Sequence, residues 1–194
     1  HTISVLKELI EVYKHPKMFK FLHIPVQAGN DKILEDMNRQ YKVEEFIKVV
    51  EEFRKEIPEI TISTDMIVGF PTETEEQFQE SMEILKKIRP DVLNLSRYAP
   101  REGTIAARMK LVSTNTQKDR SRRMTTLYRQ IAYENNQKWL SWKGKILIDE
   151  KGSGNSWIGR NYCYKQVVVD GDFKLGDEIE VEIVEAKSFY LRGK

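Results

Sequence analysis

Short apolar segments alternate with amphipathic segments through the first hundred residues, and this alternation constrains the fold more than any other feature. Strand-like segments are expected at residues 18–26, 60–68 and 91–98. Helices with apolar residues at three- and four-residue spacing are expected at about 3–13, 43–57 and 74–88. Thr74 and Gln77 fit a capping box at the start of the last helix. Strands that alternate with helices in this way predict an α/β fold with a parallel sheet over residues 1–112.

The remaining residues predict a different architecture. One long polar helix is expected from residue 113 to about 142, as a connection, with a sparse apolar face formed by Met124, Leu127, Ile131 and Leu140. Beyond it, over residues 143–194, inward and outward residues alternate between turns expected at 152–154, 170–172 and 176–177. Short, regularly spaced strands of this kind predict a small closed barrel of the OB-like type.

Composition narrows the class of protein. Hydrophobic residues make up 40% of the 194 residues, which is enough for a sizeable core. No apolar segment approaches the roughly 18 residues of a membrane helix, and Lys and Glu are interspersed through the first twenty residues. We therefore expect no signal peptide, no membrane partner and a cytoplasmic location. The single cysteine, Cys163, excludes a disulfide framework and a multi-cysteine metal site within this chain.

Three strand ends carry unusual residues. In parallel α/β sheets, ligands bind beyond the carboxyl ends of the strands. These ends read "HIPVQAGND", "STDMIVGFPTE" and "SRYAPREGT", and together they are expected to form one face. The alternative for each, taken singly, is a tight strand-to-helix turn. For Asp65, inside the second segment, the alternative is a buried carboxylate satisfied by hydrogen bonds.

The segments "HIPVQAGNDKILEDMNRQY", "STDMIVGFPTETEEQF" and "RYAPREGTIAARM", followed by the β domain, resemble the C-terminal two-thirds of the radical S-adenosylmethionine methylthiotransferases. The resemblance implies the back half of a (β/α)6 partial barrel. It also implies addition of a methylthio group to C2 of N6-threonylcarbamoyladenosine at position 37 of tRNA, since "MNRQY" and "STD" look like the archaeal and eukaryotic type. The family's radical 4Fe-4S cluster needs three cysteines. With Cys163 alone, this chain is expected to be inactive without the N-terminal domains of the same enzyme.

The resemblance assigns roles to the strand ends. Gln27 and Asn30 would face the ribose or the amino-acid portion of S-adenosylmethionine, and Arg39 would bind its carboxylate or a substrate phosphate, with a helix-end salt bridge as the alternative. Asp65 and the following backbone would line the adenine, and Tyr98 would stack on a purine or simply pack. The expected cofactor-binding residues are Gln27, Asn30, Arg39, Asp65, Ile67, Val68, Gly69 and Tyr98.

Basic residues predict an RNA partner. Residues 118–145 contain eight basic and two acidic residues, which by itself is often only a solvated face. They lead into a β module that resembles the TRAM domain, a small barrel that binds RNA in several modification enzymes. The expected contacts with a tRNA anticodon stem-loop are Arg120, Arg122, Arg123, Lys143, Lys145, Arg160, Lys165 and Arg192. The rings expected to stack on unstacked bases come from the set Trp157, Tyr162, Tyr164, Phe189 and Tyr190, of which half are expected in the core.

No catalytic residue and no metal site is assigned, because the three histidines lack ligand spacing and Cys163 has no base beside it. Two alternatives stay open. The chain is either an RNA-binding module without catalysis, or part of the sister branch that modifies a ribosomal protein. The basic β module favours tRNA over the ribosomal protein.

Overall fold

The computed structural model describes residues 5–194, so the expected start of the first helix near Ile3 lies outside the described residues. The α/β part contains α1 (Leu6–Lys14), β1 (Phe21–His23), α2 (Asp31–Asp36), α3 (Val43–Glu56), β2 (Thr61–Val68), α4 (Glu75–Ile88), β3 (Val92–Arg97), the 3-10 turn η2 (Ala106–Arg108) and α5 (Thr114–Gln137). The β part contains β4 (Lys143–Lys151), β5 (Ser156–Arg160), β6 (Gln166–Asp170), β7 (Glu178–Ala186) and β8 (Leu191–Gly193).

The first three strands form a parallel sheet in the order β1-β2-β3. The first strand is shorter than expected, and its carboxyl end is interrupted at Pro25, which has no N–H to donate to the ladder. Beside it, the Val26 N–H donates to the Thr64 hydroxyl at 3.1 Å, and pairing with β2 resumes at Gln27, which bridges to Met66. The capping box at the start of α4 is confirmed by hydrogen bonds in both directions between Thr74 and Gln77.

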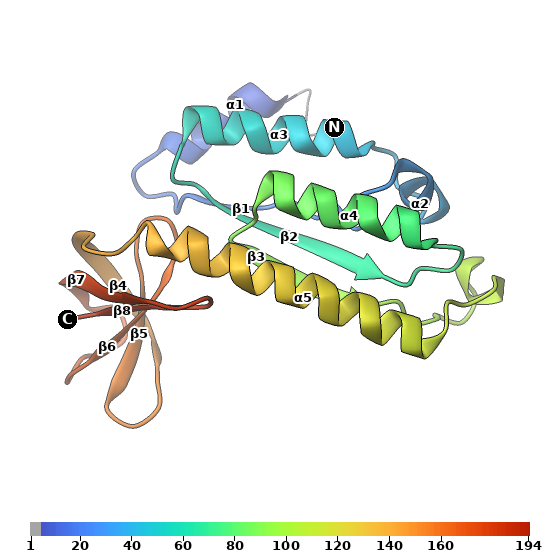
Figure 1. Cartoon of the computed structure of the whole chain (residues 1–194). Helices are drawn as coiled ribbons and strands as arrows, with labels where there is room; N and C mark the ends of the chain where they lie inside the picture. The colour runs from blue at the N-terminus through green and yellow to red at the C-terminus, as the bar shows by residue number, and fades with distance from the viewer. Residues whose placement is uncertain (1–4) are drawn as a thin grey trace.

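Helices α3, α4 and α5 cover one face of this sheet (Figure 1). Alternate residues of β2, among them Ile62, Met66 and Val68, are buried against these helices. Asp65 and Ile67 point to the opposite face and are only half-buried. The sheet therefore has one apolar face in the core and one face on which polar side chains are accessible.

Helix α5 is more than a connection, because its buried face belongs to the core of the α/β part. Met124 and Ile131 are buried there, and the Tyr128 hydroxyl donates to the Asp91 carbonyl at 3.1 Å. The helix ends at Gln137, five residues earlier than expected. The helix ends early because Trp139 packs into the core of the β part. Leu140, which was expected on the apolar face of the helix, is exposed.

The last five strands form a closed barrel in the order β4-β5-β6-β8-β7, which confirms the expected barrel. The segment 156–170 is split into two strands by a turn. In that turn the Asn161 side-chain oxygen accepts the N–H groups of Cys163 and Lys165, both at 3.0 Å, and Tyr164 has a positive φ of 60°. An Asn side chain that binds the following backbone is a usual way to make such a turn.

The barrel docks on the amino ends of the sheet strands (Figure 1). The Lys20 N–H donates to the Tyr162 carbonyl at 2.8 Å, and the Thr61 hydroxyl donates to the Cys163 carbonyl at 2.6 Å. The arrow of β2 points away from the barrel, so its carboxyl end lies at the far side of the sheet (Figure 1). Among residues 5–194, no helix combines the length and the apolarity needed to cross a bilayer.

Candidate functional site at the carboxyl ends of the strands

The three strand ends are joined by backbone hydrogen bonds. The Gln27 N–H donates to the Asp65 carbonyl, and the Gln27 carbonyl accepts the Ile67 N–H, both at 2.8 Å. The Tyr98 N–H donates to the Val68 carbonyl at 2.9 Å. Gln27, Gly69 and Tyr98 therefore lie side by side at the carboxyl ends of the strands, and we call this end of the sheet the rim. In parallel α/β folds, ligands bind beyond the carboxyl ends of the strands.

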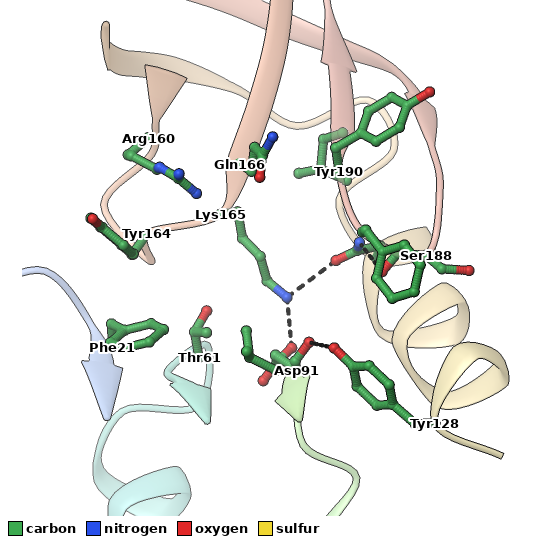
Figure 2. A pocket seen from close by; sticks show the side chains of 14 residues that line it. Phe21, Thr61, Asp91, Tyr128, Arg160, Tyr164, Lys165, Gln166, Ser188 and Tyr190 are labelled. Carbon is green, nitrogen blue, oxygen red and sulfur yellow. Dashed lines mark hydrogen bonds and ion pairs between the residues drawn. The ribbon is translucent and has the colours of Figure 1, made fainter. Parts of the chain in front are cut away.

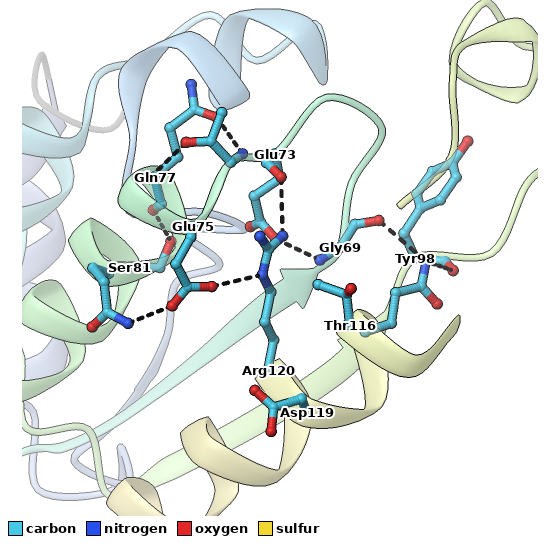
Figure 3. A network of polar contacts seen from close by, with 12 residues as sticks. Gly69, Glu73, Glu75, Gln77, Ser81, Tyr98, Thr116, Asp119 and Arg120 are labelled. Carbon is cyan, nitrogen blue, oxygen red and sulfur yellow. Dashed lines mark hydrogen bonds and ion pairs between the residues drawn. The ribbon is translucent and has the colours of Figure 1, made fainter. Parts of the chain in front are cut away.

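Gly69 is fixed at the rim by two other side chains (Figure 3). Its N–H donates to the Glu73 carboxylate at 2.7 Å, and its carbonyl accepts the Gln117 amide at 3.2 Å. A Cβ atom at this position would lie 2.4 Å from Gln117 Cγ, and the φ of +71° is itself unfavourable for other residues. The glycine is required here for close packing of α5 against the strand end.

The Glu73 carboxylate is shared with Arg120, which reaches it from α5 (Figure 3). The Arg120 Nη1 atom lies 2.7 Å from Glu73 Oε2, and the two side chains are 5% and 1% exposed. Burial raises the pKa of Glu73, and the Gly69 N–H and the Arg120 guanidinium oppose that shift. The pair stabilises the turn that follows β2.

On the accessible face of the sheet, three polar side chains form a row across the strands. Asp65 Oδ1 lies 2.9 Å from His23 Nε2 and accepts the Asn94 amide at 2.9 Å. We call His23, Asp65 and Asn94 the polar row. A carboxylate between an imidazole and an amide can orient both groups toward a ligand above the sheet.

His23 and Asn94 are not among the residues predicted from the sequence. The signal was present, since Asn94 and Ser96 alternate with Leu93 and Leu95, which places two polar side chains on the face away from the helices. His23 follows the buried Leu22 in the same way. The apolar residues of this alternation indicate the core, and the polar residues between them indicate the accessible face of the sheet.

The other predicted cofactor residues are placed as follows. The Asn30 side chain caps α2 by accepting the Ile33 N–H at 3.1 Å and donates to Glu80 at 2.8 Å, so its polar atoms are engaged. Val68 is buried against the helices, which leaves only its backbone at the rim. Arg39 is exposed and makes no ion pair with another described residue, so the helix-end salt bridge is not formed.

Tyr98 lies against Phe70, with the ring centroids 5.2 Å apart and the planes at 75°. Its hydroxyl is buried and finds no hydrogen-bond partner among the described residues. A buried phenol oxygen normally has a partner. Tyr98 is therefore the predicted site residue with an unfilled hydrogen-bonding requirement.

Two of the basic residues expected to contact RNA are buried in ion pairs. Arg120 binds Glu73 as described above, and Lys165 binds Asp91, with Lys165 Nζ 2.6 Å from Asp91 Oδ1. These cations neutralise buried carboxylates and are not available to phosphate groups. The expectation of phosphate contacts was wrong for these two side chains, because the sequence does not show which carboxylate each one meets.

Three further basic residues keep partial access to solvent. Arg160 binds Asp149 at 3.0 Å with 18% of its side chain exposed, Arg192 binds Asp170, and Arg123 binds Glu75 at 2.7 Å. Arg122, Lys143 and Lys145 are exposed. Arg122 pairs with Asp119 at 3.1 Å and Lys143 lies 3.5 Å from Glu182, whereas Lys145 makes no ion pair with a described residue.

The described residues do not fit an iron–sulfur cluster. Within residues 5–194 no three His, Cys, Asp or Glu side chains are grouped as metal ligands. Cys163 is buried at the docking surface of the barrel, and burial raises the pKa of its thiol to about 12. A three-cysteine ligand set is therefore not formed by this part of the chain.

Comparison with known proteins gives two family matches. Residues 1–85 match the family model of the Radical SAM superfamily, and residues 145–194 match that of the TRAM domain. Coproporphyrinogen III oxidase (HemN) from Escherichia coli, a radical SAM enzyme, has a similar fold, with a TM-score of 0.55 at 18% identity over 94% of this chain and 43% of that chain.

Curated relatives match along the whole chain. It is 44% identical over 194 residues to a probable threonylcarbamoyladenosine tRNA methylthiotransferase of Archaeoglobus fulgidus, and 45% identical to the protein of the same name from Pyrococcus horikoshii. A threonylcarbamoyladenosine tRNA methylthiotransferase of Xenopus laevis is 34% identical over 197 residues. The chain spans 45% of the two archaeal relatives and 35% of the third. These matches confirm the resemblance carried by the sequence motifs.

Proposed function

We propose that this chain is the C-terminal part of a cytoplasmic radical SAM methylthiotransferase that adds a methylthio group to C2 of N6-threonylcarbamoyladenosine at position 37 of tRNA. One observation carries the proposal. All of the chain aligns at 44% identity with a protein named as a probable threonylcarbamoyladenosine tRNA methylthiotransferase, and its radical SAM and TRAM matches follow in order.

The rim supports a role in binding S-adenosylmethionine. Gln27, Gly69 and Tyr98 lie together at the carboxyl ends of parallel strands, and the polar row lies on the face beside them. In this proposal the three strands are the last part of a (β/α)6 barrel. The strand preceding β1 in the whole protein would then pair with the free edge of β1. The backbone near Ile67 and the Tyr98 hydroxyl, which has no hydrogen-bond partner within residues 5–194, are the groups we expect nearest the cofactor.

The 4Fe-4S cluster is assigned to the part of the protein outside this chain, because the described residues do not fit it. No step of the reaction is therefore derived from the residues present here. The contribution we assign to this chain is to bind S-adenosylmethionine at the rim and to hold the RNA.

The RNA-binding role rests on the barrel and on the exposed cations. Lys143 and Lys145 lie on β4, within or next to the TRAM match, and Arg122 lies on α5. The barrel and the rim lie at opposite ends of the sheet, separated by the eight residues of β2, or roughly 26 Å. We infer that the RNA extends along the molecule, as an anticodon stem-loop with its modified base at the rim would.

The proposal is tested on the full-length protein, expressed in cells whose tRNA carries N6-threonylcarbamoyladenosine without the methylthio group. Nucleosides from digested tRNA are analysed by mass spectrometry, and we expect the methylthio derivative to appear. A variant lacking the cluster cysteines is the control. Unmodified tRNA with intact RNA binding would favour a binding module instead, and a methylthio group found only on a ribosomal protein would favour the sister branch.

A further inference from the structure

A cavity of about 330 Å³ lies between the barrel and the amino ends of the sheet strands (Figure 2). It is at the opposite end of the sheet from the rim. Phe21, Thr61 and Asp91 line it from the sheet, and Tyr128 and Asn136 line it from α5. The rest of the lining comes mainly from the barrel, including Tyr164, Lys165 and Phe189. Its volume is at the lower end of the range found for small-molecule and cofactor pockets.

Fixed polar groups form one side of this cavity. Lys165 extends from the barrel toward Asp91 (Figure 2), and its Nζ atom lies 2.6 Å from Asp91 Oδ1 and 3.1 Å from Asn136 Oδ1. A lysine ammonium group has three N–H donors. Two are used in these contacts, and the part of the chain described here offers no acceptor to the third. The cavity therefore contains a buried hydrogen-bond donor that is held in place and has capacity for a ligand.

Aromatic rings form the other sides. Phe189 is 55% exposed although it lines the cavity, and its ring centroid is 6.1 Å from that of Tyr128. The turn that carries Phe189 is anchored to α5, because the Asn136 amide donates to the carbonyl oxygens of Lys187 and Ser188 at 2.8 and 3.2 Å. Tyr164 is also partly exposed, and the Arg160 guanidinium lies 4.9 Å from its ring centroid. Rings held in this way can stack on a planar ligand without further ordering.

The charge balance indicates which ligand fits. Lys165 is paired with Asp91, and Arg160 is paired with Asp149, so the two cations at the cavity are neutralised by carboxylates. A phosphate group or another free anion would be repelled by Asp91 as it approached Lys165. An uncharged planar group with hydrogen-bond acceptors meets no such repulsion. Nucleobases combine an aromatic face with carbonyl and ring-nitrogen acceptors.

We propose that this cavity binds one unpaired base of an RNA, stacked on Phe189 and accepting a hydrogen bond from Lys165. The inference rests on the proposed function, since it needs RNA as the partner, and it adds a second point of RNA contact at the end of the sheet remote from the rim. The barrel supplies both residues, and both lie within the TRAM match. Stacking is tolerant of base identity, so the contact would grip an unstacked nucleotide whatever its sequence.

The test measures the affinity of the full-length protein for two RNAs, an anticodon stem-loop and a blunt-ended duplex of the same length. The variants are Phe189→Leu, which removes the ring, and Phe189→Trp, which keeps one. Tyr133→Leu is the matched control, because Tyr133 is an exposed ring on α5 that does not line the cavity. Thermal unfolding midpoints check that each variant folds as the unsubstituted protein does.

We expect Phe189→Leu to weaken stem-loop binding roughly 5- to 150-fold, which corresponds to the loss of one base stack. The salt dependence of binding should not change, because no phosphate contact is lost. Phe189→Trp and Tyr133→Leu should bind as the unsubstituted protein does, and duplex affinity should be the same throughout.

Two results would overturn the inference and leave the proposed function standing. One is stem-loop affinity of Phe189→Leu within twofold of the unsubstituted protein, which would show that the Phe189 ring does not stack on the RNA. The other is an equal loss for duplex and stem-loop. If the unsubstituted protein binds neither RNA, the proposed function itself fails, and this inference fails with it.

Discussion

Glu73 accepts hydrogen bonds from both the Gly69 N–H and the Arg120 guanidinium, each at 2.7 Å, so one buried carboxylate joins the end of β2 to helix α5. Glu73 and Arg120 are 47 residues apart in sequence. The conformation of the rim therefore depends on the packing of α5. The helix that leads to the barrel also holds the strand end at which we place the cofactor.

Replacing Arg120 with Met should destabilise the protein by about 3 to 5 kcal/mol, the usual cost of leaving one partner of a buried ion pair uncompensated. Arg122→Met is the matched control, because Arg122 lies on the same helix with 77% of its side chain exposed, and we expect a change within about 0.5 kcal/mol. Urea unfolding midpoints provide the comparison. Equal midpoints for the two variants would show that the Glu73 pair contributes nothing.

A Gly69→Ala substitution tests the close approach of α5 to the rim. Its Cβ atom would lie 2.4 Å from Gln117 Cγ, in a backbone conformation with φ of +71°. Gly103 provides the control, since its φ is +82° but nothing lies within 4 Å of an added Cβ.

Gly103→Ala should cost only the left-handed backbone penalty of about 1 to 2 kcal/mol. Gly69→Ala should cost about 1 to 3 kcal/mol more, as overpacked sites do. Denaturant unfolding of both variants measures the difference. Equal losses of stability would show that the contact with Gln117 relaxes at little cost and that close packing does not require glycine at position 69.

Strands and helix caps are predictable from local sequence patterns, because they depend on residues that are close in sequence. The strand at 60–68 and the Thr74 capping box were found because alternation and capping are set within a few positions. The roles of Arg120 and Lys165 were not found. Lys165 meets Asp91 across 74 positions of sequence, so its burial is decided by how the barrel docks, which no local pattern records. The sequence therefore does not distinguish a basic residue that faces a phosphate group from one that pairs with a buried carboxylate.

The Cys163 thiol should be unreactive in the folded protein. Burial raises its pKa to about 12, far above the value near 8.5 for an exposed cysteine, so almost no thiolate is present at pH 8. Iodoacetamide at pH 8 should therefore label the chain slowly in buffer and rapidly in urea, as followed by mass spectrometry.

The raised pKa of the Cys163 thiol predicts that the stability of the protein falls as the pH rises. The pKa is higher in the folded state, so the contribution is complete below about pH 8.5 and is lost as the pH rises toward 12. Cys163→Ala should remove this part of the alkaline loss. Equal labelling rates in buffer and in urea would show that the thiol is accessible in the native state.

Exposed and buried lysines of the barrel should affect RNA binding differently. Lys145 lies exposed on β4 and makes no ion pair with a described residue, whereas Lys165 is held by Asp91 and Asn136. In the full-length protein, Lys145→Met should lower the slope of log affinity against log salt by about 1, as expected for one lost phosphate contact. Lys165→Met should leave that slope unchanged and lower the urea midpoint instead, because it leaves the Asp91 carboxylate buried without its cation.

RNA titrations at several salt concentrations, with unfolding curves for each variant, separate the two roles. A reduced slope for Lys165→Met together with an unchanged midpoint would assign this lysine to phosphate contact and contradict its placement as a structural cation.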